Sequence, residues 1–263
     1  QMCIRDSLMH MEGQLGPDYG SLRTYKTFDE VLEAVDKQFA YWCEQIRGSN
    51  DVIDVAHREC KPLPYISSLF EDCIERGKCI TEGGAKYNFT APQAAGIATC
   101  ADALATIKQL MFEEKSVTGD ELLQAIYDNW EGHEQLYALV NSTKVHHYGN
   151  DDDYADELFR FIYESFCRNL NVGENPRGGS YIPGVYTVNA NVGLGLATNA
   201  SLDGRKKGEP LSDNMGPVHT IGGSHDVSGP TALISSVSKV DHSLAMNGTL
   251  SVSYTHLTLP TIA

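Results

Sequence analysis

Residues 203–250 read DGRKKGEPLSDNMGPVHTIGGSHDVSGPTALISSVSKVDHSLAMNGTL, and this stretch is the most informative part of the sequence. Glycines and prolines interrupt it repeatedly as far as Pro230. Glycine permits positive φ and close backbone approach, whereas proline fixes φ. The apolar residues Leu211, Met215, Val218 and Ile221 argue against disorder. The stretch is therefore predicted to begin as a long, shaped loop of the kind that usually carries function.

The same stretch is predicted to end in one short helix. Pro230 stands where a helix accepts proline, at its first position. Leu233, Val237 and Val240 then recur at helical spacing, and Gly248 is expected to end the helix.

Composition and charge indicate a globular protein. The chain has 263 residues, of which 41% are hydrophobic, enough for a sizeable core. Its net charge of −15 argues against a nucleic-acid partner. No run approaches the roughly 18 apolar residues of a membrane span, so no membrane partner is expected.

The cysteines and the first residues bear on the compartment. The chain contains 7 cysteines in no tight disulfide framework, which fits reduced thiols. Residues 1–13 lack the apolar core of a signal peptide. We therefore expect a cytoplasmic protein.

Upstream, the pattern is mainly helical. A capping box at Thr27–Glu30 predicts a helix that ends near Gly48, and residues 51–64 follow as a connector. A further helix is predicted over Ile66–Arg76, with its apolar residues inward and Gly77 as its stop. The inward residues would be Leu69, Phe70, Cys73 and Ile74.

The second half of this upstream region adds more helices and one strand. A long helix is predicted over Gln93–Lys115, and a second capping box at Thr118–Glu121 opens the next. The latter helix would be lined by Leu122, Leu123, Ile126, Tyr127 and Trp130.

Acidic and β-branched residues mark the last upstream elements. Asn150 or Asp151 is expected to cap a helix whose first turn is acidic. The segment Tyr181–Leu196 favours a β-strand, with Gly193 and Gly195 allowing close backbone approach.

Taken alone, the residues give little chemistry. No Gly-x-Ser-x-Gly elbow and no paired-histidine metal helix occurs. His225 and Asp226, with His219 nearby, form a His–acid group suited to general acid–base work, or to ordering the loop by hydrogen bonds.

Metal-binding patterns are incomplete. An acidic run begins at Asp151, but its twelfth position is Ile162 rather than the glutamate of a calcium loop. His57 and Cys60 are three residues apart, a spacing that metals can use, but no partner pair of ligands follows at suitable spacing. Cys73 and Cys79 lack the close pairing of a zinc knuckle. We predict no metal site, and a zinc protein built on these four residues is the alternative.

Several short motifs follow one another in a fixed order along the chain. They are Gly83–Thr90, Tyr148–Tyr154, Asn175–Gly179, Asp203–Lys206, Gly208–Leu211, Gly229–Ala232, Ser236–Lys239 and Asn247–Leu250. In this order they resemble the glycyl radical enzymes, which include the pyruvate formate-lyase-like lyases and dehydratases. The Gly-Pro-Thr-Ala form resembles the diol dehydratase and choline trimethylamine-lyase branch.

The resemblance implies a fold and domain limits. Such enzymes form a ten-stranded α/β barrel wrapped in helices, and this chain is expected to be a helix-rich partial section of it. Residues 8–250 would belong to the pyruvate formate-lyase-like domain. Residues 1–7 and 251–263 look like translated adapter sequence from a metagenomic assembly.

The resemblance also implies a chemistry. The family stores a radical on a glycine and relays it to the substrate through a cysteine thiyl. A S-adenosylmethionine iron–sulfur activase installs the glycyl radical, and no bound cofactor is expected in the chain itself. The resemblance implies that the parent protein is a formate C-acetyltransferase-like lyase or dehydratase of anaerobic metabolism. Such an enzyme would act on a small oxygenated substrate and would be a homodimer.

The chain departs from the family at both radical positions. None of its 7 cysteines follows a glycine, and the Gly-Tyr pair of the radical loop is missing. No residue can be assigned either radical role. We therefore expect an internal fragment, inactive alone, with both radical loops outside the chain.

Pocket residues are predicted from the same motifs. In the family the loop before Gly229, Pro230 and Thr231 lies near the buried site, so these three residues are the first candidates. His219 and His225 are the others. The alternatives are that these residues are barrel scaffold, and that the whole chain is a non-catalytic scaffold or interaction module.

Overall fold

A computed structural model describes residues 16–220 and 223–248. The predicted adapter segments 1–7 and 251–263 lie outside the described residues. The helices are α2 (Phe28–Cys60), α3 (Pro64–Ser67), α4 (Cys73–Arg76), α5 (Ile97–Thr106), α6 (Gly119–Tyr127), α7 (Glu134–Val140), α8 (Asp153–Leu170), α9 (Ala190–Leu196) and α10 (Pro230–Ser238). The strands are β1 (Gly184–Val185), β2 (His219–Thr220), β3 (Gly223–Ser224) and β4 (Asn247–Gly248).

Helix α2 begins as predicted but is much longer. The Thr27 side chain accepts the Glu30 N–H, and the Glu30 carboxylate accepts the Thr27 N–H, which completes the capping box. The prediction of an end near Gly48 and a connector over 51–64 was wrong, because the helix continues to Cys60. Tertiary contacts hold the helix on both sides of the glycine: Arg47 Nη1 donates to the Asn169 carbonyl, and the Tyr181 hydroxyl donates to Asp51.

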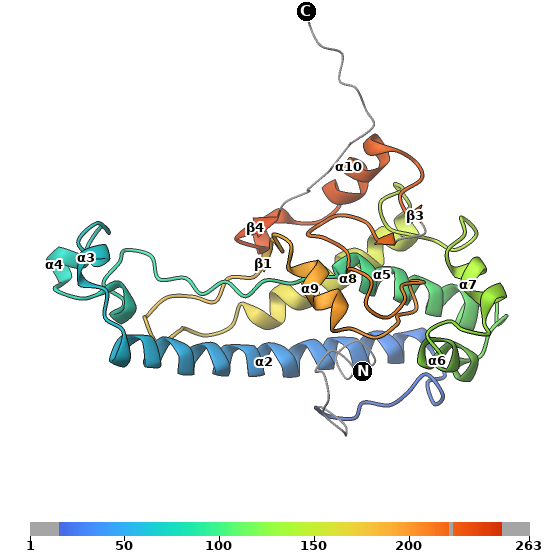
Figure 1. Cartoon of the computed structure of the whole chain (residues 1–263), viewed down its shortest axis with the longest axis horizontal. Coiled ribbons are helices and arrows are strands. Elements are labelled where there is room, and N and C mark those ends of the chain that lie inside the picture. Colours follow the sequence, from blue (N-terminus) through green and yellow to red (C-terminus); the bar gives the residue numbers. More distant parts are fainter. Residues whose placement is uncertain (1–15, 221–222, 249–263) are drawn as a thin grey trace, which may run out of the picture.

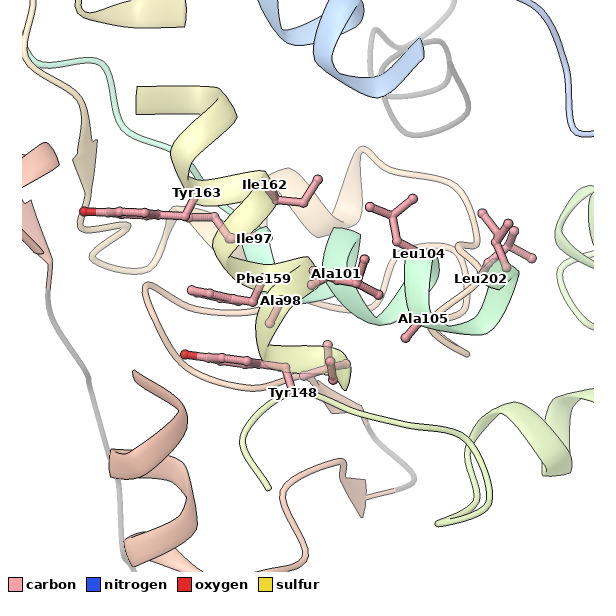
Figure 2. Close-up of a cluster of buried hydrophobic side chains, with 14 of the residues drawn as sticks. Ile97, Ala98, Ala101, Leu104, Ala105, Tyr148, Phe159, Ile162, Tyr163 and Leu202 are labelled. Carbon is pink, nitrogen blue, oxygen red and sulfur yellow. The ribbon is translucent and has the colours of Figure 1, made fainter. Parts of the chain in front are cut away.

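The core lies where α8 packs against both α2 and α5 (Figure 1). Figure 2 shows Phe159 and Ile162 of α8 beside the α5 residues Ala98 and Ala101. Alanine side chains let the two helices approach closely. Tyr148 stacks on Phe159 with 3.8 Å between ring centroids, so the loop before α8 is part of this core.

The predicted helix over Gln93–Lys115 forms in a shortened and altered form. It starts at Ile97, because Gly96 adopts φ +82° and residue 93 is in an extended bridge with residue 184. From Ile107 to Glu113 the helix has π geometry, so Lys115 lies beyond its end. The apolar residues that recur at helical spacing in this segment are buried at the first four positions and half-buried at the last; they are Ile97, Ala101, Leu104, Ile107 and Met111.

A narrow parallel ladder supplies the β part of this α/β fold. Thr90 pairs with Tyr181 and Gln93 with Gly184 in parallel bridges. On the other side, β1 pairs in parallel with β4, with Val185 opposite Gly248. Helices connect these neighbouring segments in sequence, as parallel pairing requires.

The predicted strand over Tyr181–Leu196 was wrong in its second half. Strand β1 ends at Val185, and helix α9 occupies Ala190–Leu196. The chain turns at Val188, which has φ 59°, and the residues that follow are compatible with a helix. Close backbone approach is present at Gly195, where an added Cβ would lie 2.3 Å from the Glu209 carbonyl oxygen. At Gly193 an added Cβ would have no neighbour within 4 Å.

The predicted helix over Ile66–Arg76 was also wrong. Two one-turn helices, α3 and α4, stand in its place, because Asp72 adopts φ 73° between them. Of the apolar residues predicted to face inward only Cys73 is buried; Leu69, Phe70 and Ile74 are exposed. The stop at Gly77 is confirmed, since this residue is left-handed with φ 60°.

The predicted limits of α6, α8 and α10 can be compared with the structure. The capping box of α6 is confirmed, although Tyr127 of that helix is exposed. Asp152, not Asn150 or Asp151, caps α8 by accepting the Tyr154 N–H at 3.0 Å. Helix α10 starts with Pro230 at its first turn as predicted, but it ends at Ser238 and Gly248 lies in β4.

Candidate functional site

Much of the Gly-rich stretch, residues 203–250, is buried and structural. The Arg205 side chain is fully buried and donates to the carbonyl oxygens of Lys206 (3.2 Å), Glu209 (2.9 Å) and Asn199. Its Nε donates to Ser201 Oγ at 3.1 Å. Because this buried guanidinium donates its hydrogen bonds to backbone carbonyls, it stabilises the conformation of the loop and has a structural role.

His219 lies on the exposed side of the stretch. It opens the β2–β3 hairpin, in which it pairs with Ser224. Its Nε2 lies 3.4 Å from Asp226 Oδ1, and its side chain is 66% exposed. Solvent weakens such a pair, so its contribution to stability is small.

His225 turns the other way, into the interior. Its backbone N–H donates to the Val218 carbonyl at 3.0 Å, and its Nδ1 lies 2.9 Å from Asp102 Oδ2. The residue is 5% exposed. Burial lowers the pKa of His225, but the hydrogen bond and charge of Asp102 outweigh this effect and leave the pKa raised.

Asp102 of α5 is the centre of the group. It is fully buried; its Oδ1 accepts the Tyr148 N–H at 2.8 Å, which leaves Oδ2 facing two imidazoles. Burial raises the pKa of this carboxyl, but the contacts with His147 and His225 outweigh it and hold the pKa below its usual value. The carboxylate is therefore ionised at neutral pH.

His147 completes the group from the loop before α8. Its ring stacks on that of His225 with centroids 4.0 Å apart, and its Nδ1 lies 3.3 Å from Asp102 Oδ2. The residue is 6% exposed. Neither of its ring nitrogens has the geometry of a hydrogen bond to any described residue.

The remaining predicted pocket residues form the start of α10. Gly229 precedes the helix with φ 86°, and Pro230 and Thr231 are exposed. Asn150 Oδ1 fixes the approach to them by accepting the backbone N–H groups of Val227 and Ser228, at 2.9 and 3.0 Å. The five predicted residues thus share one segment, with only His225 directed into the core.

A separate cavity lies among the helices. It is apolar, has a volume of about 300 Å³, and is lined by residues of α2, α5, α8 and α9 together with Leu211. None of the five predicted pocket residues lines it. The assignment of Gly229, Pro230, Thr231, His219 and His225 to a substrate pocket stays a prediction.

Sequence reasoning found His225 but missed its partners. Asp102 and His147 come from segments distant from His225 in the chain, so no local motif connects them. The one available signal was an aspartate within the apolar first turns of α5. The alternative zinc set of His57, Cys60, Cys73 and Cys79 does not come together, because within residues 16–220 and 223–248 only Asp102, His147 and His225 are grouped closely enough to hold a metal.

The family is shown by comparison with known proteins. The family model described as pyruvate formate lyase-like matches residues 4–195. The chain therefore belongs to the pyruvate formate lyase-like family, as the sequence motifs predicted. Its relatives include (2S)-3-sulfopropanediol dehydratase of Klebsiella oxytoca, 69% identical over 237 residues, which are 90% of this chain and 29% of that protein. Trans-4-hydroxy-L-proline dehydratase of Clostridioides difficile is 36% identical over 237 residues, 90% of this chain and 29% of that protein.

Solved structures agree on the fold. A structure described as 1,2-propanediol dehydration in Roseburia inulinivorans matches with a TM-score of 0.84 and 41% identity, over 94% of this chain and 32% of that one. The B12-independent glycerol dehydratase of Clostridium butyricum matches with a TM-score of 0.82 and 39% identity, over 88% of this chain and 28% of that one. The chain is thus a helix-rich section of a glycyl radical enzyme barrel, and it spans about 29% of the length of the curated relatives it matches.

Proposed function

We propose that this chain is a section of a glycyl radical dehydratase that eliminates water from a small vicinal diol. The observation that carries the proposal is its 69% identity over 237 residues to (2S)-3-sulfopropanediol dehydratase. Loss of water from a 1,2-diol leaves an aldehyde, so the atoms balance without an added oxidant or reductant. A sulfonated propanediol is the first substrate to test.

Within the enzyme, this section would form part of the barrel and the helices around it, and it would not carry the radical residues. Its parallel segments at 90–93, 181–185 and 247–248 would form part of the barrel lining, and the packed helices α2, α5 and α8 would lie outside it. The chain has neither a Gly-Cys nor a Gly-Tyr pair, so the thiyl cysteine and the radical glycine would lie in sequence outside it. A sealed barrel protects a radical from solvent, which is what such a wall provides.

The full assembly would have the partners of its family. It would receive its glycyl radical from a S-adenosylmethionine iron–sulfur activase, act as a homodimer and work in the cytoplasm. No described helix combines the length and apolar character needed to cross a membrane. Gly229, Pro230 and Thr231, with His219 and His225, remain the residues proposed to line its substrate pocket.

The test is a chimera of the Klebsiella oxytoca dehydratase in which the 237 matched residues of this chain replace the corresponding section. After treatment with the activase and S-adenosylmethionine, the chimera is given (2S)-3-sulfopropanediol or 1,2-propanediol. The proposal expects aldehyde from the sulfonated diol, and none from the isolated chain treated in the same way.

The outcomes separate the class of enzyme from its substrate. Aldehyde from 1,2-propanediol alone would overturn the sulfonated substrate while keeping the dehydratase. A folded chimera that forms no aldehyde from either diol would overturn the function and favour a non-catalytic scaffold module.

A further inference from the structure

We infer that Asp102, His147 and His225 form a binding site for one divalent transition-metal ion, with Zn²⁺ as the reference ion. The inference stands on the described side chains and does not depend on the proposed reaction. The three residues come from α5, from the loop before α8, and from the loop before α10. One ion at this point would join all three segments.

The ligand geometry is the first argument. One ligand atom from each residue can be chosen so that all three lie within 4.8 Å of one another. Asp102 Oδ2 is 2.9 Å from His225 Nδ1 and 3.3 Å from His147 Nδ1. Ligands at zinc distances of about 2.1 Å in a tetrahedron lie about 3.4 Å apart. The two observed separations are close to that spacing, and a solvent or substrate atom could occupy the fourth position.

The donor set is the second argument. Two imidazole nitrogens and one carboxylate oxygen suit Zn²⁺ and also Fe²⁺, and they differ from the all-oxygen sets that bind Ca²⁺ or Mg²⁺. All three residues are at least 94% buried, since their exposed fractions are 0%, 6% and 5%. Burial leaves few competing water ligands.

The groups behind the ligands are arranged to orient them. Asp102 Oδ1 accepts the Tyr148 N–H at 2.8 Å, which fixes the carboxylate with Oδ2 toward the histidines. His225 Nε2 lies 3.4 Å from Asn141 Oδ1, which can accept its N–H. A metal-binding histidine commonly donates its second N–H in this way, and the outer partner fixes which nitrogen binds the ion.

The lack of hydrogen-bond partners for His147 is the strongest argument for a bound ion. It is 6% exposed, and both of its ring nitrogens lack a hydrogen bond within the described chain. Buried polar groups almost always have a partner, and an absent partner calls for a water or an ion. Its Nδ1 is 3.3 Å from Asp102 Oδ2, so a bound ion could accept the lone pair of this nitrogen.

Charge balance also favours a cation. Asp203 is a second fully buried carboxyl, its Oδ2 has no hydrogen-bond partner among the described residues, and it interacts electrostatically with Asp102 and His225. Arg205 offsets part of this negative charge. A divalent ion bound at Asp102 would offset buried negative charge in this region, and the Nδ1 proton of His225 would be released to solvent on binding.

The test measures Zn²⁺ binding in the chimera described above. The chimera is stripped with a chelator, titrated with Zn²⁺ against a chromogenic competitor, and then loaded with Co²⁺ for its visible absorption. The variants are D102N, H147Q and H225Q, with N141A for the outer partner. The matched control is H219Q, which removes an exposed histidine near His225.

The expected result is one equivalent of Zn²⁺ per chain and a rise in melting temperature on binding. Each ligand variant should weaken affinity at least about 100-fold and N141A about tenfold, while H219Q changes neither. Co²⁺ should give the intense absorption of a low-coordinate site in the unchanged protein and lose it in H147Q.

The inference is overturned if the folded chimera binds no more Zn²⁺ than its H147Q variant, or if Zn²⁺ leaves its melting temperature unchanged. A chimera that does not fold after chelation is refolded with and without Zn²⁺. Refolding that Zn²⁺ fails to promote also overturns the inference, because a site that binds only the native state must stabilise it.

Discussion

Among single residues, Cys79 has the environment of a reactive thiol. Its Sγ accepts the Leu63 N–H at 3.1 Å and lies 3.0 Å from Ser67 Oγ. Burial raises the pKa of this thiol, but hydrogen bonds involving Ser67, Thr81 and Leu63 outweigh it and lower the pKa to about 7. The thiolate is therefore well populated at neutral pH and is lost as the pH falls below this value.

Alkylation of Cys79 by iodoacetamide, followed by mass spectrometry, should thus rise with pH around a midpoint of about 7. S67A should raise that midpoint. A rise of one pKa unit would slow labelling at pH 7 about fivefold, because the thiolate fraction falls from about one half to about one tenth. S68A is the control, since Ser68 Oγ donates to the Tyr65 carbonyl instead. Equal labelling of S67A and S68A would contradict the account.

The residue scale is also where sequence reasoning was weakest. His225 could be singled out because it stands beside Asp226 in a Gly-rich loop, but its hydrogen bond goes to Asp102 rather than to that neighbour. Chain folding, not sequence proximity, brings Asp102 and His147 to it. Asp226 lies instead beside His219, on the exposed side of the loop.

At the scale of elements, two helical glycines make a matched pair. An added Cβ at Gly48 of α2 would have no neighbour within 4 Å, whereas at Gly195 of α9 it would lie 2.3 Å from the Glu209 carbonyl. Gly48→Ala should stabilise its helix by about 0.5–1 kcal/mol, because alanine loses less backbone entropy. Gly195→Ala should destabilise by about 1–3 kcal/mol through overpacking.

Amide hydrogen exchange in the chimera measures both effects locally. Exchange should slow around residue 48 in the first variant and quicken around residues 190–198 in the second. A faster exchange near residue 48 would show that the long helix is broken at its glycine, as the sequence alone had indicated.

The start of α6 tests the capping boxes in the same way. Thr118 Oγ1 accepts the Glu121 N–H at 3.3 Å, and the Glu121 carboxylate accepts the Thr118 N–H at 2.7 Å. Thr118→Ala should cost about 1 kcal/mol of local stability, while Thr118→Ser keeps the acceptor and should cost a few tenths at most. Hydrogen exchange of the first turn distinguishes them, and equal losses would argue against the cap.

Element starts were more predictable than element ends. Capping boxes and Pro230 are local signals and gave the starts of α2, α6 and α10. The end of α2 depends on contacts from Asn169 and Tyr181, far away in the chain. The segment 181–196 changes from strand to helix at Val188, and β-propensity alone does not show such a change.

At the scale of the molecule, several large apolar side chains of the chain are exposed. Leu69, Ile74, Val188 and Leu196 are each between 67% and 73% exposed. The prediction that the apolar residues of 66–76 face inward was wrong because no described element covers them. In the full enzyme, the rest of the barrel is expected to cover such faces.

The isolated chain should consequently aggregate or form a loose state, because exposed apolar patches and open ladder edges associate. Size-exclusion chromatography with light scattering, together with thermal melting, measures this. The chimera is the control and should remain folded, with a cooperative melt. A soluble monomer of the isolated chain with a sharp cooperative melt would contradict the expectation.

Electron paramagnetic resonance of the activated chimera tests whether this chain forms a working section of a glycyl radical enzyme, because a stored glycyl radical requires a correctly closed barrel. The account predicts a glycyl radical signal comparable to that of the unchanged Klebsiella oxytoca dehydratase, and none from the isolated chain. A correctly folded chimera that accepts no radical from the activase would contradict it.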